Sequence, residues 1–222
     1  TAIFPRLSEQ ASAEDNSGLQ SSLTDSLRFV WVIGLPATCA MIILRGPLVE
    51  VLYEHGAFSR ESTIAVSGVL IWYAIAVLAD AMCQPLWRII YAWRSVLTVS
   101  VVNGIQTIVR ILFNIMLIQS FGIRGIAFSA VIGFLLQVVI LSWLVQRRLG
   151  IEFVFNWWQE ARFAVLASII VSIAVWLLAN QILSTSAFIT LLVSGALGCL
   201  LYLVVFGYLR NWRKYRSGLN AN

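Results

Sequence analysis

The stretch GLPATCAMIILRGPLVEV (residues 34–51), LYEHGAFS (52–59) and, shortly after it, TIAVSGVLIWYAIAV (63–77) sets a short polar segment between two long apolar ones. About 20 apolar residues in a helix cross the roughly 30 Å hydrocarbon core of a bilayer. The same alternation continues along the 222 residues, of which 60% are hydrophobic and only 11% charged, with a mean hydropathy of +0.88. A soluble domain has about a quarter of its residues charged. The composition therefore predicts a multi-pass membrane protein.

Six apolar windows predict membrane-spanning helices, at residues 28–48, 64–90, 96–118, 124–146, 161–180 and 187–208. Backbone polar groups within lipid must be satisfied inside the protein, so we expect an all-α transmembrane bundle of six full spans. The short connections predict that consecutive spans are antiparallel. Pro36 and Pro85 lie inside the first two windows and predict kinks there.

Basic residues are distributed unequally between the two sides that these spans define. Eleven arginines and lysines fall on the side of both termini, whereas Arg45, Arg60 and Arg124 fall on the other side. The positive-inside rule then predicts cytoplasmic termini and an external loop at 52–59. Because the basic residues form no continuous stripe, we expect no nucleic-acid partner despite the net charge of +5.

The polar loop at 52–59 contains His55, which is the only histidine of the chain. Glu50, Glu54 and Glu61 lie near it in sequence, but no second histidine or cysteine does. A zinc site needs three or four converging ligands, so we expect no metal site and an ordinary exposed loop. The chain also lacks phosphate-binding, Gly-x-Ser-x-Gly and His-Glu-x-x-His motifs. We therefore expect no catalytic residue, no bound cofactor and no enzymatic activity.

Polar residues within the predicted spans are the candidates for function, because ionisable groups at membrane depth are costly. Asp80 lies in the second window. Asn103, Gln106, Arg110 and Asn114 lie in the third window at spacings of three or four residues, which predicts that they share one helix face directed into the bundle. Two interpretations remain open for this face: hydrogen bonding between helices, or a lining of a translocation path.

The segment before the first window is the only long hydrophilic one. Leu19, Leu23 and Leu27 recur in it every four residues, which predicts a short amphipathic helix on the cytoplasmic membrane surface, with a flexible loop as the alternative. Residues 1–8, TAIFPRLS, have the character of the end of a preceding span. Together with the absence of an initial methionine, they lead us to expect a piece of a longer protein.

Three stretches together resemble one family: AIFPRLSEQAS (2–12), GLPATCAMIILRGPLVEVLYEHGAFS (34–59) and FGIRGIAFSAVIGFLLQVVILSWLVQRRLG (121–150). They are similar to the MurJ (MviN) lipid II flippases, within the multidrug, oligosaccharidyl-lipid and polysaccharide exporter superfamily. The resemblance implies a fold of two six-helix lobes with two additional helices at the end. On that template, residues 1–27 are the end of a preceding span and a cytoplasmic amphipathic linker. Residues 28–148 are the remaining helices of the C-terminal lobe, and 149–222 are the two last helices with a basic cytoplasmic tail.

The resemblance also implies a function. It predicts a flippase of the bacterial inner membrane that moves undecaprenyl-linked peptidoglycan precursor by alternating access. Its partners would be that glycolipid, membrane lipids and the missing N-terminal lobe, where most headgroup-binding cations of the family lie.

This chain departs from the family at several positions. Arg110 stands where relatives often have a small polar residue, and Ala130 where they often have a hydroxyl. Some relatives are thought to hold sodium there, so we expect a guanidinium in place of an ion. Tyr91-Ala92 is followed by WRSVLTVS, without the usual proline of this turn. The alternatives are an exporter of another undecaprenyl-linked sugar, such as an O-antigen or capsule unit, a drug/cation antiporter, and a non-transporting membrane scaffold.

Overall fold

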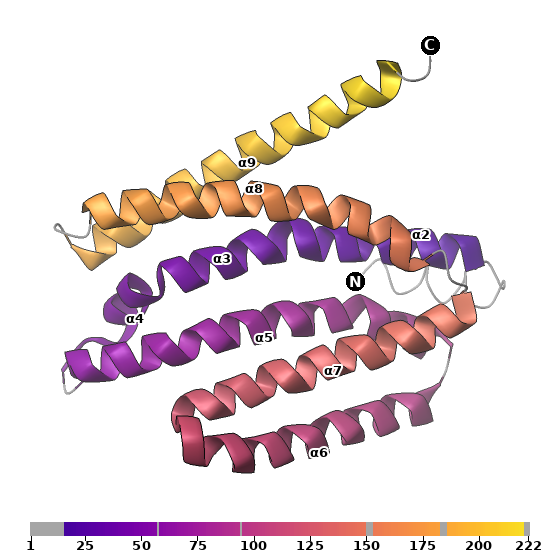
Figure 1. The fold of residues 1–222 in the computed structure, drawn as a ribbon, viewed down its shortest axis with the longest axis horizontal. Coiled ribbons are helices and arrows are strands. Elements are labelled where there is room, and N and C mark those ends of the chain that lie inside the picture. The colour runs from indigo at the N-terminus through magenta and orange to yellow at the C-terminus, as the bar shows by residue number, and fades with distance from the viewer. Residues whose placement is uncertain (1–15, 57, 94, 150–152, 183–185, 220–222) are drawn as a thin grey trace. The chain divides into compact units, whose positions relative to one another are not determined.

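The computed structural model describes residues 16–56, 58–93, 95–149, 153–182 and 186–219, and every regular element within them is helical (Figure 1). The all-α prediction is therefore confirmed. The end of a preceding span, predicted at 1–8, lies outside the described residues. In chain order the elements are α2 (Asn16–Phe29), the π-helix η1 (Val30–Gly34), α3 (Leu35–Ile43), α4 (Arg45–Tyr53), α5 (Arg60–Ala92), α6 (Val96–Phe121), α7 (Ile123–Leu149), α8 (Phe153–Ile182) and α9 (Ala187–Leu219).

Five stretches among the described residues are long and apolar enough to cross a membrane: Gly18–Ile43, Arg60–Ala92, Val96–Phe121, Ile123–Leu149 and Ala187–Gly207. Each overlaps one predicted window. The remaining window, 161–180, coincides with a shorter apolar helical segment, Ala164–Asn180. The count of six spans and the cytoplasmic position of the termini stay predictions.

The first predicted window, 28–48, is not one regular helix. Pro36 has no N–H to donate to the carbonyl four residues earlier, and the helix widens into η1 immediately before it. A second interruption follows at Leu44, after which α4 begins at Arg45. Pro47 lies in the first turn of α4, where its missing N–H would have no helical partner in any case. By contrast, α5 continues through Pro85 to Ala92.

The chain divides into two compact units, each built from separated segments. The first unit contains the chain up to Gly34 together with residues 72–158, and the second contains residues 35–71 and the chain from Gln159 onward. Helices α5 and α8 each contribute to both units.

A leucine face of α2 forms part of the core of the first unit. Leu19, Leu23 and Leu27 are only 1%, 1% and 3% exposed. The same cluster contains buried side chains of α5, α6 and α7: Cys83, Leu86, Ile89, Ile90, Val99, Val102, Leu141 and Val145. The predicted amphipathic helix therefore exists, but its apolar face packs against other helices and not on the membrane surface. Spacing identifies an apolar face, whereas it does not say what covers that face.

The second unit contains a seam of buried small and polar side chains along one face of α9. Thr190, Ser194 and Tyr202 of α9 are 1%, 0% and 8% exposed, and Gly198 continues the same every-fourth spacing. A Cβ atom added at Gly198 would lie 2.7 Å from Cγ2 of Val175 on α8. The missing side chain thus permits a close approach of the two helices, as small residues commonly do in membrane helix pairs.

Candidate functional site

The polar face predicted on α6 forms the contact with α7, and the two helices run antiparallel as a hairpin (Figure 1). Gln106 is buried, Arg110 and Asn114 are partly buried, and Asn103 is exposed. Gly122, with φ of +55°, ends α6, and its N–H donates to the carbonyl of Ile118 at 3.0 Å. The prediction that the four polar residues share one face is consistent with their common neighbour, α7.

Hydrogen bonds join the two ends of this face to α7. Near one end, Nε2 of Gln137 donates to Oδ1 of Asn103 at 3.0 Å. Near the other end, the hydroxyl of Ser129 donates to Oδ1 of Asn114 and also lies 2.7 Å from the carbonyl oxygen of Ile126. Such bonds between membrane helices contribute about 0.6 kcal/mol on average. These hydrogen bonds therefore determine which faces of α6 and α7 contact each other, and they add little to the stability of the helix pair.

Two glycines of α7 allow the helices to approach closely, Gly133 between these bonds and Gly125 beyond Ser129, toward the turn. A Cβ atom added at Gly133 would lie 3.2 Å from Nε2 of Gln106 and 3.5 Å from Cβ of Arg110. One added at Gly125 would overlap the carbonyl oxygen of Leu117 on α6. Gln106 thus packs over a position where any side chain on α7 would displace it.

Arg110 is the only charged member of the α6 face. Its guanidinium carbon lies 6.0 Å from the centroid of the Phe134 ring on α7, at the outer limit of a cation–π contact. Asp80 lies on α5 and is partly buried. Within the described part of the chain, Asp80 and Arg110 form no ion pair with each other. The four α6 candidates thus share a contact with α7, whereas Asp80 lies on α5 and, within the described chain, forms no ion pair with Arg110.

Sequence reasoning missed the partners that α7 supplies. Gly125, Ser129, Gly133 and Gln137 recur every four residues, and all four are buried. That spacing is the available signal, because small residues at every fourth position are typical of close helix pairs in membranes. Most residues of this window are apolar, so its hydropathy did not reveal the spacing of these four residues.

A strip of α6 next to this contact is polar and exposed. Ser100, Asn103, Gly104 and Thr107 are all exposed, although they lie inside a helix that is apolar enough to span a membrane. Polar side chains at membrane depth are costly to place against lipid. Ser100 and Thr107 were not among the predicted site residues, because a hydroxyl is unremarkable in a helix until its surroundings are known.

The predicted polar loop at 52–59 begins inside α4, which ends at Tyr53, and the described residues after it are held by local contacts. The carboxylate of Glu54 accepts a hydrogen bond of 2.6 Å from Oγ1 of Thr63, and the rings of Tyr53 and Phe58 lie 6.0 Å apart. Gly56 has φ of +63°, in the region that favours glycine. His55 is exposed, as predicted. Among the described residues, no group of three or more histidine, cysteine or acidic side chains could hold a metal ion.

The chain is similar in sequence to known proteins of one family. The family model of the lipid II flippase MurJ matches residues 1–197. The chain is 25% identical over 148 residues to a protein of Rhizobium meliloti (strain 1021) and 30% identical over 142 residues to one of Rhizobium tropici, both described as probable lipid II flippase MurJ. These matches cover 66% and 64% of this chain, but only 28% and 26% of the relatives.

A solved structure of lipid II flippase MurJ in an inward closed conformation has the same fold. It matches with a TM-score of 0.77 and 21% sequence identity, over 95% of this chain and 43% of that structure. These matches thus cover less than half of the length of each of the three known proteins.

Proposed function

The chain belongs to the MurJ family of lipid II flippases, and we propose that it acts as the C-terminal part of a transporter that moves lipid II across the membrane by alternating access. The observation that carries this proposal is the family match over residues 1–197. Family membership and the apolar helices make the chain a multi-pass protein of the bacterial inner membrane. Its proposed partners are an undecaprenyl-linked glycolipid, the surrounding lipids and an N-terminal lobe of the same transporter.

The polar strip of α6 is the surface to which we assign the contact with the rest of the transporter. Ser100, Asn103 and Thr107 are exposed in a helix that is otherwise apolar. A strip of this kind avoids lipid and faces either another protein segment or an aqueous cavity. In an alternating-access transporter both environments occur at the boundary between the two lobes. The N-terminal lobe would therefore cover this strip in one state and leave it facing water in another.

Arg110 is the residue of this chain to which we assign an electrostatic role. Placing an arginine at the centre of a membrane helix costs about 2.5–3.5 kcal/mol on insertion scales. A lipid-linked sugar pyrophosphate is anionic, and a guanidinium binds phosphate oxygens in a fixed geometry. Arg110 would then either contact the substrate or pair with an acidic residue of the N-terminal lobe. The proposed process transfers a molecule between leaflets and makes or breaks no covalent bond, so no catalytic residue is required.

Complementation tests the proposed function. Residues 1–222 are joined to the N-terminal part of an established lipid II flippase, and the host's own flippase is depleted. We expect growth with normal wall synthesis. Lysis of cells in which the chimaera is present in the membrane at normal levels would overturn the assignment to lipid II.

The same strain tests Arg110. We expect Arg110→Ala to abolish growth and Arg110→Lys to restore part of it, because lysine retains the charge but not the bidentate geometry. Gln119→Ala is the matched control, since Gln119 is an exposed polar residue near the end of the same helix. Full growth of Arg110→Ala would remove Arg110 from the mechanism while leaving the family function in place.

A further inference from the structure

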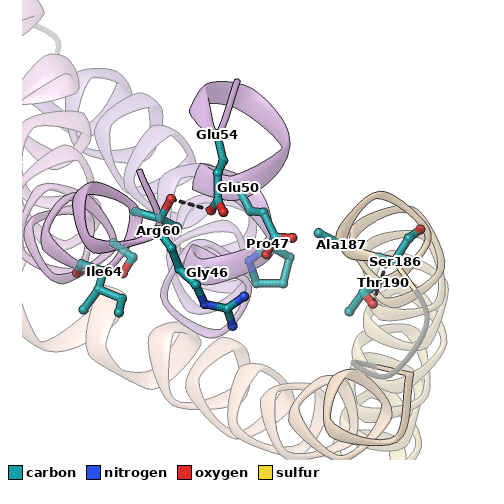
Figure 2. A pocket seen from close by; sticks show the side chains of 11 residues that line it. Gly46, Pro47, Glu50, Glu54, Arg60, Ile64, Ser186, Ala187 and Thr190 are labelled. Atoms are coloured by element: carbon teal, nitrogen blue, oxygen red, sulfur yellow. Dashed lines mark hydrogen bonds between the residues drawn. The ribbon is translucent and has the colours of Figure 1, made fainter. Parts of the chain in front are cut away.

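A cavity of about 530 Å³ lies in the second unit, where α4 and the first turns of α5 and α9 meet (Figure 2). Its volume is within the range of about 300–1,000 Å³ typical of small-molecule sites. None of its residues belongs to the polar face of α6. The lining residues are Gly46, Pro47, Glu50, Glu54, Arg60, Thr63, Ile64, Ser67, Ser186, Ala187 and Thr190.

The lining contains charges of both signs. Glu54 is already engaged, because its carboxylate accepts the 2.6 Å hydrogen bond from Thr63. Glu50 and Arg60 are exposed, and within the described residues they form no ion pair with each other. Figure 2 shows both side chains extending toward the space between α4 and the start of α9. One carboxylate and one guanidinium are therefore available to a ligand in the same cavity.

Hydroxyl groups of the lining are held in place by local hydrogen bonds. Oγ of Ser186 accepts the N–H of Ile189 at 3.3 Å, and Oγ1 of Thr190 donates to the carbonyl of Ser186 at 3.0 Å. The hydroxyl of Ser67 donates to the carbonyl of Ile64 at 3.0 Å. A hydroxyl that donates one bond keeps lone pairs that can accept another. The hydroxyl of Ser67 therefore offers a fixed acceptor in the cavity wall for a ligand with N–H groups.

The surroundings of the cavity are apolar and exposed. Ile64, which lines it, is 61% exposed, and Phe188 and Ile189, which directly follow the lining residue Ala187, are 57% and 43% exposed. In a membrane protein such side chains contact lipid. A ligand that is charged at one end and apolar at the other fits this combination, whereas a free ion or a sugar would leave the apolar rim unused.

We propose that this cavity binds the headgroup of a phosphatidylethanolamine-type lipid, with Arg60 on the phosphate and Glu50 on the primary ammonium. A zwitterion with both groups satisfies both free charges at once. An anionic lipid such as phosphatidylglycerol would leave Glu50 unpaired. A choline headgroup has no N–H to donate to Glu50. The proposal concerns a bound membrane lipid and does not depend on which substrate the transporter carries.

Native mass spectrometry of the purified full-length protein tests this site. Phosphatidylethanolamine, phosphatidylcholine and phosphatidylglycerol with the same acyl chains are added in turn, and the fraction of lipid-bound protein is measured. We expect phosphatidylethanolamine to bind about tenfold more tightly than either of the others, because one charge-assisted hydrogen bond is gained. Soluble phosphoethanolamine in excess should compete weakly if the acyl chains also contribute.

Single substitutions assign the two contacts. We expect Glu50→Gln and Arg60→Gln each to remove most of the preference, and Arg60→Lys to keep much of it. The matched controls are Glu61→Gln and Arg124→Gln, which remove one exposed charge each outside the lining and should retain the preference. Equal binding of the three lipids by the parent protein would overturn the proposal. Equal losses in the control variants would also overturn it, since they would show a general effect of surface charge. Because Glu50 and Arg60 are exposed, we expect the variants to fold, and an unchanged melting temperature checks this.

Discussion

Replacing Gly125 by alanine tests the close contact between α6 and α7 directly. The added methyl group would overlap the carbonyl oxygen of Leu117 and lie 2.7 Å from its carbonyl carbon and 3.0 Å from its Cβ. Two of these three atoms belong to the backbone, so the contact cannot be relieved by a change of rotamer. Overpacking of this kind costs about 1–3 kcal/mol. We therefore expect Gly125→Ala to destabilise the hairpin in spite of the better helix propensity of alanine.

Gly104→Ala is the matched control on α6. A Cβ atom at Gly104 would meet nothing within 4 Å. The same change should therefore stabilise by about 0.5–1 kcal/mol, since alanine loses less backbone entropy than glycine in a helix. The two substitutions are chemically identical and predicted to have opposite signs.

Thermal unfolding in detergent, followed by a thiol-reactive fluorescent dye, measures both variants. Cys83 is fully buried in the first unit and becomes reactive when that unit opens, whereas Cys199 is exposed and Cys39 is intermediate. A background with Cys39→Ser and Cys199→Ser leaves Cys83 as the reporter. At about 2–4 °C for each kcal/mol, Gly125→Ala should lower the melting temperature by roughly 2–12 °C. A melting temperature equal to that of the parent, or a decrease as large in Gly104→Ala, would refute the reasoning.

Three further outcomes are expected in the same assay or in a parallel one. Leu23→Ala should cost about 2–5 kcal/mol, because Leu23 is 1% exposed within the core; a change below about 0.5 kcal/mol would place α2 outside that core. A double-mutant cycle of Asn103→Ala and Gln137→Ala should give a coupling of about 0.6–1.7 kcal/mol, and additive effects would show that the two side chains do not bond. Thr63→Val should expose the loop carrying Glu54 to faster proteolysis, because the 2.6 Å bond between them is lost; unchanged cleavage kinetics would show that this bond does not restrain the loop.

Much of the fold follows from hydropathy, because a helix that crosses a bilayer must have both a certain length and an apolar composition. The window 96–118 became the helix Val96–Phe121, and the window 124–146 became Ile123–Leu149. The region around Pro36 was predicted to kink, and the π-helix just before it is the form that this irregularity takes, whereas the break at Leu44 was not predicted. Which of several allowed distortions a proline produces depends on tertiary packing, which the sequence pattern does not contain.

Only the α6 residues of the candidate site could be predicted from the sequence. The spacing of Asn103 and Asn114 placed them on one helix face, because helical geometry is local. Their partners, Gln137 and Ser129, lie 34 and 15 residues further along the chain. No periodicity within one helix identifies a partner on another. The leucines of α2 show the same limit, since an apolar face serves lipid and protein equally well.

The seam of α9 has a consequence for how the sequence can diverge during evolution. Thr190 and Ser194 are buried, and the size of the side chain at Gly198 is restricted by Val175 of α8. Outward positions such as Leu203 and Val204, which are 67% and 68% exposed, need only remain apolar. Substitutions should therefore accumulate quickly on one side of this helix and slowly at every fourth residue on the other. A chain can then share only 21% of its residues with a solved relative and still superpose on it with a TM-score of 0.77.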